Sequence, residues 1–178
     1  MSENTQDNTL WIQLVAGTDS QGMPVLEKLE VTRQAGNQDK EHGSPGESDY
    51  YVLVRSPLFV RDLAAGDVFT CNPENPADYE VIQRSGNLAI RLFRRDNISE
   101  VEEMLTPEVE KLDGRLELTT DRALVYTLHV NIGFGAIEKL FDGIMASYPD
   151  CVWYYGNIYS RQDGVTPLNW WHDFINQV

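Results

Sequence analysis

The chain has 178 residues, of which 42% are apolar, and its 28 Asp and Glu residues outnumber the 14 Lys and Arg residues to give a formal net charge of −14. This length allows one large domain or two small subdomains that share a core. The negative charge repels phosphate backbones, so the composition disfavours direct nucleic-acid binding, whereas a basic protein partner would be attracted.

The sequence also argues against export and against a membrane span. The first eight residues are polar and lack the basic and then apolar order of an export signal, and no apolar run approaches the ~18 residues that a spanning helix needs. Cys71 and Cys151 lie in separate predicted strands without a CxxC spacing or a nearby metal-ligating set, which is typical of buried apolar thiols. We therefore expect a cytoplasmic protein that binds no membrane and holds no metal or cofactor.

Residues 9–84 have the pattern of a β-rich subdomain. Short apolar segments are separated by turns that contain Gly, Pro and Asp, with barely a helical period among them. This pattern predicts a small antiparallel sheet or a partly closed, barrel-like sheet. The expected strands are residues 10–16, 25–33, 50–55, 68–71 and 79–84, and the expected loops include 34–49 and 72–78. Because residues 34–49 contain no Val, Ile, Leu, Phe, Trp or Tyr, we expect this loop to be mobile.

In residues 85–160 the apolar period changes from two to 3.6 and back again. The expected order is strand, helix, strand, strand, helix, strand, which is a split βαββαβ or ferredoxin-like subdomain. The second helix has the strongest pattern, with apolar residues at spacings of three and four: Phe134, Ile137, Leu140, Phe141, Ile144, Met145 and Tyr148. In the first helix, Ser99 and Glu102 match a capping box. Pro107 would break that helix unless Thr106 caps a new turn.

Residues 161–178 are expected to form a C-terminal helix that docks on the body. Thr166 and Pro167 match a cap followed by a first helical residue. The expected docking stripe comprises Leu168, Trp171, Phe174 or Ile175, and Val178. The whole chain is therefore predicted to be an α+β protein: a small antiparallel N-terminal sheet, a ferredoxin-like half and a C-terminal helix.

The middle of the chain resembles a known family. In residues 56–69 a Pro-Leu-Phe segment leads to a Gly66-Asp67-Val68 turn, and residues 80–91 then place a Ser-Gly turn before a strand that ends in Arg91. These runs resemble the bacterial domain-of-unknown-function family DUF4265, and the resemblance extends over about residues 50–159. It implies the fold of that family, and it implies no activity, cofactor or catalytic residue.

The histidines are the candidates for acid–base catalysis. His42 lies in the predicted mobile loop and His129 in a predicted strand. His172 precedes Asp173, but adjacent helical residues point about 100° apart and would not contact each other easily. No nucleophile elbow, phosphate-binding loop, dinucleotide fingerprint or HExxH helix is present. The sequence therefore favours a protein that is not an enzyme.

Four arginines form a local reversal of charge within twelve positions of this acidic chain: Arg84, Arg91, Arg94 and Arg95. Guanidinium groups bind carboxylates and phosphates with two hydrogen bonds, so these residues could form an anion site. Alternatively, Glu100, Glu102 and Glu103 neutralise them within the protein.

Aromatic residues crowd the last quarter of the chain, and the candidates for a partner-binding surface are Trp153, Tyr155, Trp170 and Trp171. Either the C-terminal helix and the N-terminal sheet cover these side chains, or the side chains form an exposed patch of the kind that anchors protein interfaces.

Three functional hypotheses follow. The leading one is a non-catalytic protein-binding module whose partner is another protein, a basic one by charge, by analogy with the small acidic immunity proteins that neutralise bacterial toxins. The alternative is a sensor that binds an anionic metabolite near Arg91 and Arg94, in a cleft between the two halves. The third is an enzyme with His129 or His172 as its base.

Overall fold

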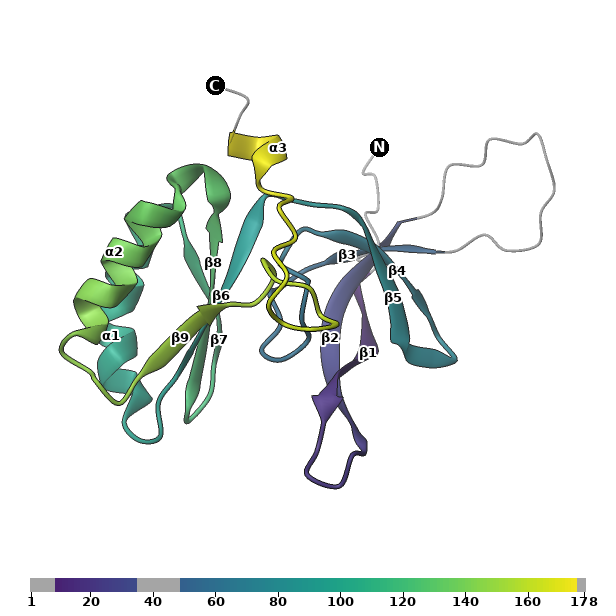
Figure 1. Ribbon diagram of the computed structural model, residues 1–178, viewed down its shortest axis with the longest axis horizontal. Coiled ribbons are helices and arrows are strands. Elements are labelled where there is room, and N and C mark those ends of the chain that lie inside the picture. Colours follow the sequence, from purple (N-terminus) through teal and green to yellow (C-terminus); the bar gives the residue numbers. More distant parts are fainter. Residues whose placement is uncertain (1–8, 35–48, 176–178) are drawn as a thin grey trace, which may run out of the picture.

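The computed structural model describes residues 9–34 and 49–175. Two antiparallel sheets lie beside each other, and two helices cover the outer face of the second sheet (Figure 1). The predicted α+β fold is therefore confirmed. Of the predicted loop 34–49, residues 35–48, which include His42, lie outside the described residues.

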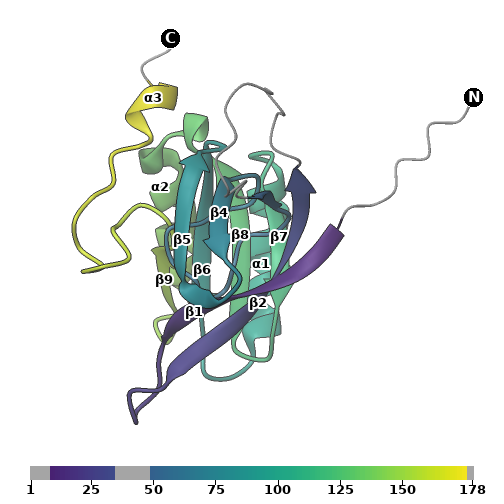
Figure 2. The ribbon, with the colours of Figure 1, turned by 90° about the vertical axis from the view of Figure 1, so that its right-hand side faces the viewer.

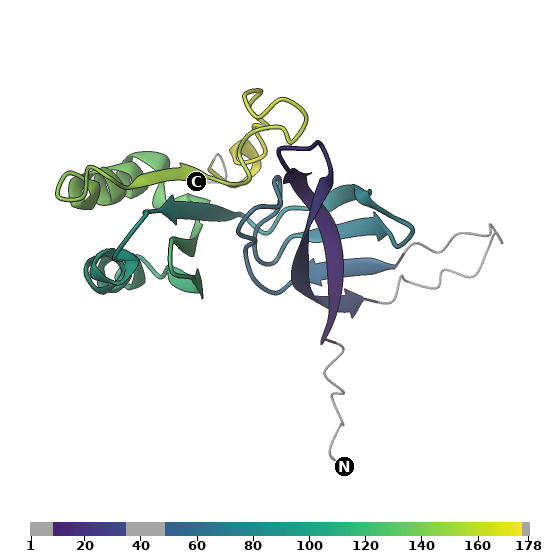
Figure 3. The same ribbon diagram turned by 90° about the horizontal axis from the view of Figure 1, so that it is seen from below.

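The first sheet is a meander in which each strand pairs antiparallel with the next. Its strands are β1 (Thr9–Thr18), β2 (Pro24–Gln34), β3 (Tyr50–Leu53), β4 (Val68–Asn72) and β5 (Asn75–Gln83). The β1–β2 hairpin runs diagonally across the other strands, as Figures 2 and 3 show, and β1 also contacts β5. The sheet therefore curls towards a barrel around its own apolar core, which includes Leu14, Val31, Leu53, Phe69 and Tyr79.

Strand β5 begins earlier than expected. Residues 72–78 were predicted to be a loop because they contain two prolines, yet Asn72 pairs with Asn75 across a tight turn and the strand continues through Pro76. A proline has no backbone N–H, and an edge strand tolerates it because one side of that strand has no ladder to complete. The position of β5 at the end of the sheet therefore explains the difference.

The second sheet has the ferredoxin-like strand order β7-β8-β6-β9. Its strands are β6 (Asn87–Phe93), β7 (Arg115–Thr119), β8 (Ala123–His129) and β9 (Val152–Tyr155). Helix α1 (Ile98–Glu110) connects β6 to β7, while the short η1 (Val130–Ile132) and helix α2 (Phe134–Met145) connect β8 to β9. The two central strands are buried on both faces, so their sequences are apolar almost throughout.

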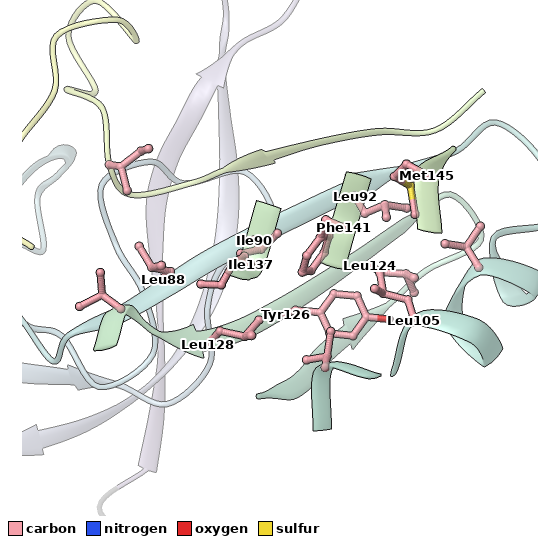
Figure 4. Close-up of a cluster of buried hydrophobic side chains, with 14 of the residues drawn as sticks. Leu88, Ile90, Leu92, Leu105, Leu124, Tyr126, Leu128, Ile137, Phe141 and Met145 are labelled. Carbon is pink, nitrogen blue, oxygen red and sulfur yellow. The ribbon is translucent and has the colours of Figure 1, made fainter. Parts of the chain in front are cut away.

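A single apolar core fills the space between this sheet and its helices (Figure 4). Phe141 of α2 packs edge-on against the Tyr126 ring of β8, with 6.0 Å between ring centroids. The Tyr126 hydroxyl lies 2.8 Å from the Thr106 hydroxyl of α1. Burial nevertheless raises the pKa of Tyr126 to about 12. No helix in the described part of the chain is long and apolar enough to span a bilayer.

Helix α1 differs from the prediction both at the expected capping box and at Pro107. It begins at Ile98, with Asn97 as a left-handed N-cap that makes no side-chain cap hydrogen bond, so Ser99 lies inside the first turn and the capping box is wrong. The helix also continues through Pro107. The carbonyl that the missing N–H would have bonded belongs to Glu103, which is exposed and can be hydrated. Thr106 faces Tyr126 instead of capping a new turn.

The C-terminal segment is packed on the body, but little of it is helical. Helix α3 comprises only His172–Ile175. The predicted start at Thr166 and Pro167 is wrong, because Pro167 forms an isolated β-bridge with Tyr159. Trp170 is the buried residue of this segment, 9% exposed, and its indole N–H donates a 2.7 Å hydrogen bond to the Asn157 carbonyl.

We expect Trp170→Ala to lower the free energy of unfolding by about 3–5 kcal/mol, because it removes a large buried ring and its hydrogen bond. Chemical denaturation followed by circular dichroism measures the change. The matched control is Trp11→Ala in β1, whose ring is 55% exposed; it should cost about 1 kcal/mol or less. Equal losses in the two variants would show that the C-terminal segment does not stabilise the fold.

Candidate functional site

The structure separates the four arginines that the sequence grouped. Arg84 forms ion pairs with Asp62 and with Asp67, the second at 3.3 Å. Its guanidinium also lies over the Trp170 ring, 5.6 Å from the centroid. Carboxylates of the protein therefore neutralise Arg84, so this residue follows the second of the two interpretations of the arginine group.

Arg94 and Arg95 have separate surroundings at the protein surface. Arg94 bonds Glu100 at 2.9 Å and Asp150 at 2.8 Å, and the carboxylates raise the pKa of its guanidinium. Of the three glutamates considered for this role, Glu100 is the one that pairs with Arg94. Arg95 is exposed. Of the two arginines predicted to bind an anion between the halves, Arg94 is thus paired with carboxylates of its own chain.

Arg91 has a different surrounding, because it is buried under the loop that follows β3. Its guanidinium donates hydrogen bonds to the carbonyls of Pro57 at 3.1 Å, Phe59 at 3.2 Å and Val60. Burial lowers the pKa of this guanidinium from its ordinary value. Arg91 thus holds the loop in place through hydrogen bonds to its carbonyls. The spacing of the arginines in sequence did not indicate this role.

A carboxylate of the first sheet holds the same loop from the opposite side. Glu27 of β2 accepts hydrogen bonds from the backbone N–H groups of Leu58, Phe59 and Val60, at 2.6 to 2.8 Å. Together, Arg91 and Glu27 form hydrogen bonds with three carbonyls and three N–H groups of residues 57–60. This loop is therefore fixed to both sheets.

The four candidate partner-binding aromatics face inward, towards α2 and the C-terminal segment. Trp153 packs on Phe141 with 5.0 Å between centroids, and Tyr155 meets Phe134 edge-on at 5.4 Å. Trp171 meets the same Phe134 at 5.5 Å, and Trp170 is buried. In these contacts α2 and the C-terminal segment pack on the four aromatic residues, whereas the prediction assigned this role to the C-terminal helix and the N-terminal sheet.

Tyr154 lies between Trp153 and Tyr155 in β9, so it points to the opposite face of the sheet and is 46% exposed. Its ring stacks on Phe93 at 5.7 Å, and Phe93 stacks on Phe59 at 6.2 Å. We call Tyr154, Phe93 and Phe59 the aromatic stack. Strand alternation alone would have identified Tyr154 as the outward residue, but the sequence gives no indication that Phe59 lies beside it.

Neither described histidine has the surroundings of a catalytic base. The Nδ1 atom of His129 accepts a hydrogen bond from the Asn131 N–H at 3.2 Å, and its ring packs edge-on against Phe174. His172 is exposed, as is Asp173, and the two side chains form no hydrogen bond. Within residues 9–34 and 49–175, no group of three or more His, Cys, Asp or Glu residues could hold a metal ion.

The segment after β9 passes between the two sheets (Figure 1). Residues of this segment line two hollows, which have Arg61 in common. The smaller, of about 240 Å³, is called the tyrosine hollow and is lined by Arg61, Arg91, Tyr154, Tyr155, Gly156, Tyr159 and Gly164. The larger, of about 580 Å³, is called the arginine hollow and is lined by Val15, Ala16, Gly17, Thr18, Arg61, Ala77, Tyr79 and Arg161. Arg61 lines both.

The arginine hollow contains two guanidinium groups without a carboxylate partner in the described part of the chain. Neither Arg61 nor Arg161 takes part in any ion pair there. Arg161 lies 3.8 Å from the centroid of the Tyr79 ring, which holds it in place, and the Tyr79 hydroxyl donates a 3.0 Å hydrogen bond to the Arg61 carbonyl.

The acidic residues next to these arginines in sequence are already occupied. Asp62 pairs with Arg84. The carboxylate of Asp163 accepts hydrogen bonds from the Thr166 hydroxyl and from the N–H groups of Thr166 and Val165, and these bonds lower its pKa to about 2. The sequence analysis missed Arg61 and Arg161 because they are 100 positions apart and only the fold brings them together.

Comparison with known proteins identifies the family. The family model described as a domain of unknown function, DUF4265, matches residues 42–147, which is more than half of the chain. The chain belongs to the DUF4265 family. The match includes Arg61, Tyr79 and Arg91 but ends before β9 and Arg161. The resemblance seen in the sequence is thereby confirmed.

The fold is similar to that of a solved structure, titled "Novel crystal structure of a hypothetical protein from Neisseria gonorrhoeae". The similarity covers 82% of this chain and 92% of that one, with a TM-score of 0.61 and 15% sequence identity. At this identity the two proteins share a fold, and nothing about function follows. No curated protein matches the DUF4265 chain.

We expect Arg91→Met to lower the free energy of unfolding by about 2–4 kcal/mol, because it removes the donors from the carbonyls of residues 57 and 60, which are buried, and of residue 59, which is partly buried. Urea denaturation measures the loss. Arg95→Met makes the same chemical change at an exposed position and should stay within about 0.5 kcal/mol of the wild type. If both variants changed the free energy of unfolding by the same small amount, Arg91 would not stabilise the loop.

Proposed function

We propose that this DUF4265 protein is a non-catalytic module that binds a small anion between Arg61 and Arg161. One observation carries the proposal: two arginines of a chain with 28 acidic and 14 basic residues line one hollow, and no carboxylate in the described residues pairs with either. A guanidinium is a rigid fork of donors that matches the oxygens of a carboxylate or phosphate.

The surroundings of the two arginines favour a preformed site. Arg161 is oriented by Tyr79, so less side-chain entropy is lost when a ligand binds. At the rim, β1 has a bulge between Val15 and Gly17, which leaves Ala16 without a partner in the register with β2. β-Bulges often lie beside binding sites, where they redirect backbone groups.

The negative net charge does not oppose such a site at contact distance. At physiological ionic strength, charges farther away than about 8 Å are largely screened. Neither hollow is lined by Asp or Glu. An anion in the arginine hollow would therefore interact mainly with the two guanidinium groups.

We propose a cytoplasmic location for this module. Cys71 and Cys151 are both free, which is typical of a reducing compartment. Both are partly buried, and burial raises the pKa of each thiol, in keeping with unreactive cysteines.

Thermal unfolding with citrate, phosphate and sulfate, each compared with chloride at equal ionic strength, tests the anion site. We expect at least one anion to stabilise the wild type, by about 2.7 kcal/mol at a concentration 100 times its Kd. The double variant Arg61→Gln, Arg161→Gln should lose this stabilisation. The control Arg95→Gln, which removes an exposed charge elsewhere, should keep it. If no anion stabilises the wild type, or if the double variant responds equally, the site does not exist.

A second candidate function is the binding of another protein, and the aromatic stack supports it. Exposed aromatic side chains anchor many protein interfaces, and at Phe59 and Tyr154 large parts of the rings are open to solvent. A net charge of −14 would attract a basic partner.

Affinity capture from native lysate at low and moderate salt tests this second function, with Phe59→Ser, Tyr154→Ser as the variant and Trp11→Ser as the control. We expect a basic protein that the wild type and the control retain, that the variant loses, and that salt weakens. A capture that is equal for all three proteins, or that retains no protein, contradicts a partner at the aromatic stack.

A further inference from the structure

We infer that the ligand of this protein carries a flat ring as well as an anionic group. Its ring would lie in the tyrosine hollow and its carboxylate or phosphate between Arg61 and Arg161. The inference rests on the anion site proposed above and extends it to the neighbouring hollow. Nucleotides and aromatic carboxylates both have this chemistry.

The two hollows are of a size to hold one ligand together. Arg61 lines both of them, so a single molecule that contacts its guanidinium can extend to either side. The tyrosine hollow, of about 240 Å³, is small for a separate ligand site, since such sites usually measure ~300–1,000 Å³. The hollow that shares Arg61 with it measures about 580 Å³, and the combined volume of the two falls inside that range.

The walls of the tyrosine hollow suit a planar group. Tyr154 and Tyr159 line it with exposed side chains, and aromatic rings present broad apolar faces on which other rings stack. At Gly156 no side chain covers the Arg91 guanidinium, because a Cβ there would lie 2.7 Å from its Nε atom. The planar guanidinium is therefore left as part of the wall, and it stacks favourably on π systems.

Arg91 also has hydrogen-bonding capacity left for such a ligand. A guanidinium has five N–H donors, and the loop carbonyls accept from three of its nitrogen atoms. The hydrogen bond from Nη1 to Phe59 is only partly buried, so this nitrogen lies near the open side. A ring with an oxygen or nitrogen acceptor would find a donor there.

Tyr159 is the residue of the hollow best suited to a test. It is 43% exposed and is anchored through its backbone by the β-bridge to Pro167. Replacement of its ring should therefore leave the fold intact. Tyr159→Leu keeps apolar bulk without the ring, and Tyr50→Leu in β3 makes the same change outside both hollows.

The experiment uses isothermal titration calorimetry with two pairs of probes. AMP is compared with ribose 5-phosphate, and indole-3-acetate with acetate, so that each pair differs by its ring. We expect the ring-bearing member of at least one pair to bind about 5- to 150-fold more tightly, the range that stacking on one aromatic residue supplies. The pair that responds identifies whether the anionic group is a phosphate or a carboxylate.

The variants then assign that gain to the tyrosine hollow. Tyr159→Leu should weaken the ring-bearing probe towards the affinity of its ring-free partner, while Tyr50→Leu should leave both unchanged. Arg61→Gln, Arg161→Gln should abolish the binding of both. If anions bind but neither pair shows a gain from the ring, or if Tyr159→Leu preserves the gain, this inference is wrong and the proposed anion site stands. If no anion binds, both are wrong.

Discussion

The structure depends on one loop, residues 57–60, that is held from both sides by opposite charges. Arg91 of the second sheet donates to its carbonyls, and Glu27 of the first sheet accepts from its amides. Arg91 is buried, and three hydrogen bonds compensate the desolvation of its guanidinium, which is the condition under which a buried charge can be tolerated. Ser56 adds a 2.6 Å hydrogen bond to Thr127 at the start of the same loop. The two sheets are thereby joined through backbone groups and not through a flexible linker.

This joint also forms the candidate site. The loop continues into Arg61, whose neighbour Asp62 donates its N–H to the Gly156 carbonyl just after β9. Arg61 is thus placed against the segment that carries Tyr159 and Arg161. The hollows are consequently made by residues from both sheets and from the C-terminal segment. Such boundaries between parts of a fold are where small-molecule sites commonly lie.

The distribution of charge separates structural arginines from candidate binding arginines. Arg84 and Arg94 have carboxylate partners, and Arg91 has carbonyl partners. Within the described residues, Arg61 and Arg161 pair with no carboxylate, and Arg161 lies on the Tyr79 ring. Both line one hollow, and Arg61 is exposed, so their donors are open to an anion from solvent.

The sequence sufficed to predict the α+β class, the ferredoxin-like order of elements and the α2 stripe, because apolar periodicity is a local property that core packing requires. Sequence reasoning failed where contacts between distant residues matter. Helix α1 continues through Pro107, where Thr106 faces Tyr126, and the segment after Ser160 consists mostly of turns and irregular structure, with Tyr159 bridged to Pro167. The candidate site depends on the tertiary structure. Arginines that are neighbours in sequence have different partners, whereas Arg61 and Arg161 line one hollow because the fold brings distant segments together. Charge alone cannot distinguish these cases, since what each guanidinium does depends on which oxygens the fold places around it.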